Sequence, residues 1–185
     1  MGRVKALLPS GDGRTFLARL AGTMEAAGVD PLVVVAGAHA AAIAAAVRAG
    51  ALRTEVVVNR APGRGQLSSL LAGLEALAPR GPEAVVVTPV DYPLVSQDTV
   101  RRLVDAWRAS GALIVRPERG GHHGHPVVFG AGLFAELRRA DLSAGARGVI
   151  ARHLADVVDV PVDDAGAFED IDTPDDYRRL IGQPL

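Results

Sequence analysis

Short β-branched runs alternate with longer stretches of helical periodicity, and this alternation restricts the fold more than any other feature. Several runs are apolar at consecutive positions, which is typical of strands that are covered on both faces. The expected strands lie at 31–37, 54–59, 83–91, 112–117, 125–130 and 156–162. Strand–helix–strand repetition predicts right-handed βαβ units. We therefore expect an α/β fold with a mostly parallel, Rossmann-like sheet in a three-layer α/β/α arrangement.

The segments between these runs predict helices, and several of their ends are marked. Ser96 is a typical helix start, as is Thr173 before a proline. Gly28 and Gly50 lie where helices are expected to end. The expected helices cover 13–28, 38–50, 66–78, 96–110, 132–140, 145–155 and 173–182. In open sheets of this kind, ligands bind beyond the carboxyl ends of the strands, so we searched there for functional residues.

Length and composition exclude several classes of protein. The 185 residues suffice for a single domain with a proper core, which we expect to span 1–185. The net charge is −1, so we expect neither nucleic acid nor an anionic membrane as a partner. The lack of cysteine excludes disulfides and thiolate metal sites. Without a signal peptide or an apolar run of about 18–20 residues, we expect a soluble, cytoplasmic protein.

One acidic residue directly follows the apolar strand in "VVVTPVDYP". Asp91 would lie at the carboxyl end of that strand, where a carboxylate can hold a metal ion. The alternative is that Asp91 only closes a turn, which aspartate does well.

A second acidic group lies far along the chain in "FEDIDTPDDY". Asp170 and Asp172 alternate along an extended piece and therefore share one face. Asp172 could point into a cleft, or could only assist the start of the helix that follows. Carboxylates from two distant segments suit Mg²⁺, which keeps several waters and is completed by substrate phosphates.

Two glycine-containing loops are candidates for substrate binding. The first, 61–65, runs into a helix whose first turn carries Gln66, Ser68 and Ser69, where free N–H groups favour an anion or the polar groups of a nucleotide. An ordinary surface loop has the same composition. The second loop, 120–126, holds three of the five histidines, and we favour a substrate loop or a loop tip there over a metal site.

Taken in order, five motifs resemble one family. They are "MGRVKALLP", "GRGQLSSLLAGL", "PVDYPLV", "GHPVVF" and "DIDTPDDY". Together they resemble the MobA-like nucleotidyltransferases, most closely the molybdenum cofactor cytidylyltransferases. No hydrolase elbow, P-loop or dinucleotide fingerprint is present, which argues against hydrolases, kinases and dehydrogenases. The resemblance implies a fold of the nucleotide-diphospho-sugar transferase type and transfer of a nucleoside monophosphate to a phosphorylated acceptor, with release of pyrophosphate.

The resemblance also implies roles for individual residues. Lys5 would neutralise the triphosphate, and Asp91 and Asp172 would bind Mg²⁺. The segment from Gln66 to Ser69 would face the base and ribose. On the acceptor side, the lining would come from Gly124, His125 and Pro126. The "GQLSS" form favours CTP as the nucleotide. The resemblance to the family implies molybdopterin as the acceptor, with a molybdenum enzyme or its chaperone as a further partner.

Family members place a strand and a glycine loop directly before the Met-Gly pair that starts this chain. We therefore expect Met1 to be an internal methionine of the family motif, and the first strand to be absent. Either the natural protein is longer and active, or the short chain has lost nucleotide turnover. We favour the first alternative, because a missing strand would leave backbone groups unpaired inside a sheet.

Three alternatives to a cytidylyltransferase stay open at this point. The chain could be a non-catalytic module that binds or delivers the acceptor without a triphosphate loop. It could use GTP in place of CTP. It could also act on another phosphorylated acceptor, because loops of this kind vary most.

Overall fold

The structure, a computed structural model, describes residues 4–142 and 144–182. Met1 therefore lies outside the described residues. The strands are β1 (Leu32–Ala36), β2 (Thr54–Val58), β3 (Ala84–Val87), β4 (Ile114–Arg119), β5 (His122–His123), β6 (Val127–Gly130) and β7 (Val157–Pro161). Each expected apolar run overlaps one of these strands, although β4 extends two residues beyond its run, and β5 is a short addition that the pattern did not predict.

The strands form two separate ladders within the described part of the chain. β1 and β2 pair in parallel, with Leu32 opposite Thr54 and Ala36 opposite Val58. The larger sheet has the order β3-β6-β4-β5, and β7 also pairs with β4. β7 runs parallel to β4, whereas β6 is antiparallel to both β3 and β4. Parallel pairing thus holds for β1–β2 and β4–β7, and β6 departs from the expected direction.

The helices follow the predicted segments closely. They are α1 (Phe16–Ala26), α2 (Ala40–Ala49), α3 (Gln66–Leu77), α4 (Gln97–Ser110), α5 (Phe134–Arg139), α6 (Gly145–Arg152) and α7 (Pro174–Ile181). The Ser96 hydroxyl accepts a hydrogen bond from the Thr99 N–H at the start of α4. Thr173 and Asp176 form a reciprocal capping box at the start of α7. Among the described residues, no helix is both long and apolar enough to cross a membrane.

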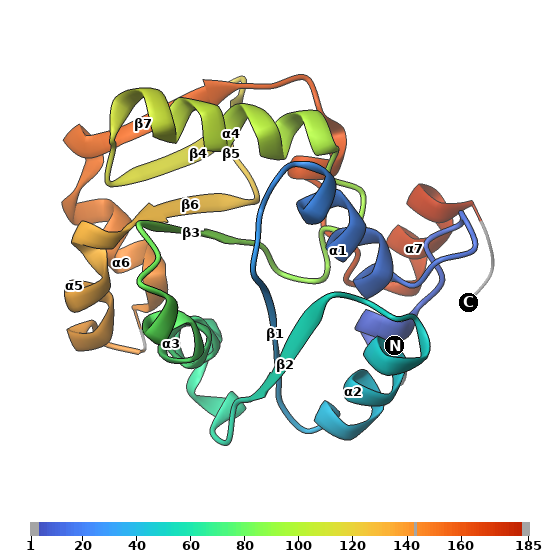
Figure 1. Cartoon of the computed structure of the whole chain (residues 1–185). Helices are drawn as coiled ribbons and strands as arrows, with labels where there is room; N and C mark the ends of the chain where they lie inside the picture. Colours follow the sequence, from blue (N-terminus) through green and yellow to red (C-terminus); the bar gives the residue numbers. More distant parts are fainter. Residues whose placement is uncertain (1–3, 143, 183–185) are drawn as a thin grey trace.

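Helices cover both faces of the larger sheet (Figure 1). On one face, Leu103 of α4 packs against Val115 and Val128. On the other face, helices α3, α5 and α6 pack against Ile114 and Phe129. Successive residues of β4 and β6 therefore enter different cores, which explains why these runs are apolar without alternation. The expected three-layer α/β/α arrangement is present.

The segment 164–168, which precedes α7, binds together two loops that are distant in sequence. The Asp164 carboxylate accepts hydrogen bonds from the Ser96 N–H at 2.9 Å and the Thr99 hydroxyl at 2.7 Å. Gly166 lies so close to the chain that a Cβ atom there would be 2.2 Å from the Leu94 carbonyl oxygen. The Ala167 carbonyl accepts a hydrogen bond of 2.8 Å from the backbone N–H of His125, in the 124–126 loop. This segment therefore fixes the loop after β3 next to the loop before β6.

Replacing Gly166 by alanine is expected to destabilise the protein, because the new methyl group would overlap the Leu94 carbonyl. We expect a loss of about 1–3 kcal/mol in the free energy of unfolding, measured by urea denaturation. Gly63→Ala is the matched control, because a Cβ atom there would meet nothing within 4 Å. Equal stability of the two variants would show that Gly166 does not lie this close to the Leu94 carbonyl.

Candidate metal and substrate site

Three segments that are distant in sequence bring one cation and three carboxylates together. Lys5 lies on the 3₁₀ turn Lys5–Leu7, Asp91 on the turn after β3, and Asp170 and Asp172 just before α7. One oxygen from each carboxylate lies within 4.8 Å of the others. The Lys5 ammonium pairs with Asp172 and lies 3.8 Å from the nearer Asp91 oxygen. The predicted meeting of Asp91 and Asp172 is therefore present in the structure.

A backbone contact explains why the carboxylates of Asp91, Asp170 and Asp172 lie close together. The Ile171 N–H donates a hydrogen bond of 2.8 Å to the Asp91 carbonyl oxygen, and the Ile171 side chain is fully buried. Because neighbouring residues in an extended segment point to opposite faces, Asp170 and Asp172 face away from that core. The sequence pattern predicts that these two aspartates share a face, but it does not identify Asp170 as a ligand.

The start of α7 is tied to the segment that carries Lys5. The Tyr177 hydroxyl donates a hydrogen bond of 2.9 Å to the Pro9 carbonyl oxygen. Its ring stacks on Phe16, with 6.1 Å between the ring centroids. Tyr177 and Phe16 are both buried. Their contact therefore holds the N-terminal segment that carries Lys5 next to the segment that carries Asp172.

Asp91 is electrostatically the most constrained group of the cluster. Burial raises the pKa of its carboxyl group, Lys5 partly offsets that effect, and the charges of Asp172 and Asp170 add to it. One Asp91 oxygen is buried and has no hydrogen-bond partner among the described residues. The folded chain thus holds the Asp91 proton more tightly than the unfolded chain does. Stability of the metal-free protein therefore falls as the pH rises from the unfolded value of about 3.9 toward the raised one.

The cluster fits a divalent ion on chemical grounds. Carboxylate oxygens are the ligands that Mg²⁺ prefers, and an ion of this kind usually takes one or two of them together with substrate phosphates. A cation would supply the partner that the buried Asp91 oxygen lacks, and it would relieve the repulsion between the three carboxylates. Lys5 supplies part of that positive charge in the structure described here.

The predicted acceptor loop lies beside this cluster. The rings of His125 and Tyr92 are in contact, with 4.7 Å between their centroids, and Tyr92 directly follows Asp91. A Cβ atom on Gly124 would lie 2.0 Å from the Ala167 carbonyl oxygen, so only glycine permits this approach. Burial lowers the pKa of His125, which favours a neutral ring. Pro126 follows in the cis form. Whether this loop binds the acceptor stays a prediction.

The polar residues at the start of α3 are hydrogen-bonded to the loop that follows β2. The side chain of Asn59 donates hydrogen bonds to the hydroxyl oxygens of Ser68 and Ser69, at 2.9 and 3.0 Å. Asn59 is buried, and its own oxygen accepts from the Ala61 N–H. Gln66, the first residue of α3, is exposed. The expected contacts of Gln66, Ser68 and Ser69 with a base or ribose stay predictions, and no local sequence pattern indicates the role of Asn59.

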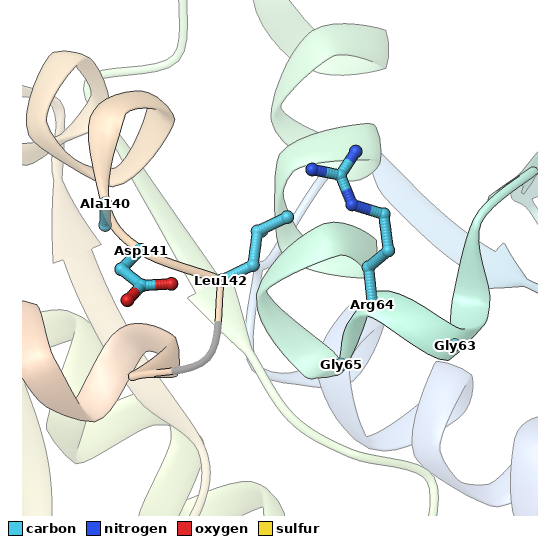
Figure 2. A pocket seen from close by; sticks show the side chains of 6 residues that line it. All are labelled: Gly63, Arg64, Gly65, Ala140, Asp141 and Leu142. Atoms are coloured by element: carbon cyan, nitrogen blue, oxygen red, sulfur yellow. The ribbon is translucent and has the colours of Figure 1, made fainter.

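Two cavities flank the start of α3. The first, of about 710 Å³, lies between residues 63–65 and residues 140–142. Figure 2 shows Arg64 on one side of it, with Asp141 and Leu142 on the other. The second, of about 540 Å³, shares Arg64 and Leu142 with the first and is also lined by Asn59. Volumes of this size suit small-molecule ligands. None of the three clustered carboxylates lines either cavity.

Asp91→Asn should stabilise the metal-free protein at neutral pH, because it removes a half-buried charge that two neighbouring carboxylates oppose. The same change should abolish the rise in Tm that millimolar Mg²⁺ causes in the unaltered protein, since ion binding stabilises only a fold that holds the ion. Thermal unfolding in chelator and in Mg²⁺ measures both effects. Asp163→Asn is the control, because that side chain is fully exposed. An unchanged response of Asp91→Asn to Mg²⁺ would contradict the metal site.

Two curated proteins and several solved structures are similar to this chain. Nicotine blue oxidoreductase of Paenarthrobacter nicotinovorans is 36% identical over 186 residues, covering 96% of this chain and 87% of that protein. Molybdenum cofactor guanylyltransferase of Cereibacter sphaeroides is 37% identical over 123 residues, covering 63% of this chain and 59% of that protein. This chain therefore spans less than two thirds of the guanylyltransferase.

The similar solved structures support the fold and the metal. Rv0371c of Mycobacterium tuberculosis has a TM-score of 0.78 and 34% identity, covering 99% of this chain and 91% of that one. The same protein has been solved in complex with manganese. A nucleotidyl transferase of Methanothermobacter has a TM-score of 0.79 at 24% identity, covering 96% of this chain and 83% of that one, and shows the fold alone. The predicted transferase-type α/β fold is confirmed.

The family follows from the match over most of the chain. Residues 1–157 match the MobA-like NTP transferase domain. MobA-like nucleotidyltransferases use a divalent metal, which confirms the metal cofactor expected from the sequence, and an acidic cluster is present among the described residues. The nucleotidyltransferase class expected from the sequence is confirmed at the level of the family. This chain belongs to the family of MobA-like NTP transferase domains.

Proposed function

We propose that the chain transfers a nucleoside monophosphate, GMP from GTP, to the phosphate of a molybdopterin-type acceptor. The observation that carries this proposal is the meeting of Lys5 with Asp91, Asp170 and Asp172. Such a site offers hard oxygen ligands for a divalent ion and a cation for phosphate, and it needs no side-chain nucleophile.

In this reaction an oxygen of the acceptor phosphate attacks the α-phosphorus of the nucleotide. A new oxygen–phosphorus bond forms, and the bond from the α-phosphorus to the oxygen that bridges to the β-phosphate breaks. Pyrophosphate leaves with that electron pair. The protein contributes alignment and charge compensation, which account for most of the catalysis in phosphoryl-type transfer.

The carboxylates, Lys5 and the 124–126 loop would have separate roles in this reaction. Asp91, Asp170 and Asp172 would hold the divalent ion, which when bound offsets the negative charge of the phosphates. Lys5 now pairs with Asp172, and we expect its ammonium to turn to the triphosphate when the carboxylates hold the ion. The loop at 124–126 would position the acceptor next to Tyr92.

The choice of nucleotide rests on the relatives. The sequence motif at the start of α3 favours CTP, whereas the curated relatives include guanylyltransferases at 37% identity. We therefore propose GTP ahead of CTP. The cavity lined by Arg60 and Glu75 offers both donors and acceptors of hydrogen bonds to a base. The acceptor could instead be another phosphorylated metabolite, and acceptor variety is part of the test.

The proposal is tested by pyrophosphate release with each of the four nucleoside triphosphates, with molybdopterin and with other phosphorylated metabolites as acceptors. We expect turnover with GTP in the presence of Mg²⁺ and none in chelator. Asp172→Ala should reduce kcat by about 10²–10³-fold, because it removes a group that compensates charge in the transition state. Asp163→Asn, on a fully exposed side chain, should leave the rate unchanged. Unchanged activity of Asp172→Ala would contradict the role of Asp172 at the metal site. A preference for CTP would support CTP as the nucleotide in place of GTP.

A binding module without turnover is the alternative that the sequence left open. It predicts tight binding of the phosphorylated acceptor together with no affinity for any nucleoside triphosphate. Isothermal titration calorimetry with GTP and Mg²⁺ on the 185-residue chain separates the two ideas. Micromolar binding of GTP supports the enzyme, and the lack of any binding heat supports the module.

A second candidate function comes from a different class of enzyme. A relative that covers 96% of this chain is named nicotine blue oxidoreductase, so we also consider reduction of a dye of that kind by NADH or NADPH, although the sequence holds no dinucleotide fingerprint. The measurement is the loss of NADH or NADPH absorbance with such a dye and the protein. Turnover that persists in Asp172→Ala and in chelator would favour this candidate over nucleotidyl transfer.

A further inference from the structure

One small apolar core contains residues from every segment that carries a charged residue of the site. Its buried members are Leu8, Phe16, Ile171 and Tyr177. In the chain, Ile171 lies between Asp170 and Asp172. Val90 packs against the same core and directly precedes Asp91. This core is therefore shared by all the segments that form the site.

Tyr177 brings a polar group into this core. Only 1% of Tyr177 is exposed, and its hydroxyl donates a hydrogen bond of 2.9 Å to the Pro9 carbonyl oxygen. A phenylalanine would fill nearly the same volume and would keep the ring stacked on Phe16. The hydroxyl therefore adds one directional contact between α7 and the segment that carries Lys5, beyond what packing alone provides.

Backbone hydrogen bonds extend this contact from Pro9 to Lys5. The Leu8 N–H donates to the Lys5 carbonyl oxygen at 3.0 Å, and the Leu8 carbonyl oxygen accepts from the Phe16 N–H at 2.9 Å. Pro9 also forms an isolated β-bridge with Thr15. The backbone from Lys5 to Pro9 is thus held as one unit, so its orientation relative to α7 determines where the Lys5 side chain begins.

Lys5 and a divalent ion compete for the same carboxylates. The Lys5 ammonium pairs with Asp172 and lies 3.8 Å from the nearer Asp91 oxygen. An ion held by these carboxylates would be repelled by the ammonium, because like charges at short distance oppose each other. A firm hold on Lys5 should therefore weaken binding of the ion before nucleotide arrives. The same hold keeps the ammonium close to a triphosphate and should favour its binding.

We propose that Tyr177 is a positioning residue. Its hydroxyl, through Pro9, holds Lys5 at the cluster, and it thereby weakens binding of the divalent ion alone and strengthens binding of the triphosphate. Tyr177 acts through Lys5 and touches neither ligand. The inference rests on the proposed function for the triphosphate, whereas the effect on the ion can be measured without nucleotide or turnover.

Titration with Mn²⁺, followed by electron paramagnetic resonance, tests the effect on the ion. Tyr177→Phe should bind Mn²⁺ about 3–10-fold more tightly than the unaltered protein, because loss of one buried hydrogen bond loosens the competing ammonium. In a Lys5→Ala background, Tyr177→Phe should have no effect, since the group through which it acts is absent. Asp91→Asn should lose the ion, which shows that the titration reports on the cluster.

Val149→Ala is the control for a general loss of stability. Val149 is fully buried in the separate core beside α3 and α5, so its truncation should lower Tm and leave the Mn²⁺ affinity unchanged. Equal or weaker binding of Mn²⁺ by Tyr177→Phe would overturn the inference. An effect of Tyr177→Phe that persists without Lys5 would also overturn it.

Calorimetry with GTP at saturating Mg²⁺ tests the opposite effect. Tyr177→Phe should bind GTP about 3–10-fold more weakly, because the ammonium that faces the triphosphate is less well held. A merely structural role of Tyr177 would weaken binding of both the ion and the nucleotide, whereas the proposal requires changes of opposite sign. Weaker binding of both ligands therefore contradicts it.

The outcomes separate failure of this inference from failure of the proposed function. If the unaltered protein binds Mn²⁺ at the cluster and turns over GTP, but Tyr177→Phe changes neither affinity, the proposed function stands and the inference fails. If Tyr177→Phe tightens Mn²⁺ binding only when Lys5 is present, but no nucleotide binds to the unaltered protein, the positioning of Lys5 stands and the transferase proposal fails.

Discussion

Three carboxylates within reach of a single ion repel one another, and this repulsion is the constraint on which the rest of the site depends. Asp91 is half-buried, so its charge is poorly solvated, and Asp170 and Asp172 approach it from another segment. Lys5 compensates part of this charge. A site that costs folding free energy in this way is useful only if a cation and phosphates complete it. The acidic cluster is therefore better explained by function than by stability.

The surrounding fold overcomes that repulsion by close backbone packing. Gly166 and Gly124 let the segment before α7 approach the loops after β3 and before β6 more closely than any side chain would allow. Asp164 holds the same segment to the start of α4. Because the two glycines approach backbone atoms of the neighbouring segments, they position the carboxylates through the rigid part of the chain. The site thus combines a strained arrangement of charges with a tightly packed support.

Local patterns in the sequence were sufficient to predict the helices, every strand except the short β5, and two of the three clustered carboxylates. Consecutive apolar residues indicate strands between two layers, and Asp91 and Asp172 stand out at the ends of such segments. Pairing between distant strands is not written in any local pattern, so the antiparallel direction of β6 was not predicted. The role of Asn59 depends on contacts between segments, which only the three-dimensional structure brings together.

The ladder of β1 and β2 has a consequence for the dynamics of the protein. In the described part of the chain, these strands share no backbone hydrogen bonds with the larger sheet. Two-stranded ladders are marginally stable alone, and such units can open while the remaining core stays folded. Their amide protons should therefore exchange with deuterium faster than those of β4. The loop that carries Asn59 and Arg64 continues from β2. Opening of this ladder would therefore widen the cavity beside α3 and admit a larger ligand.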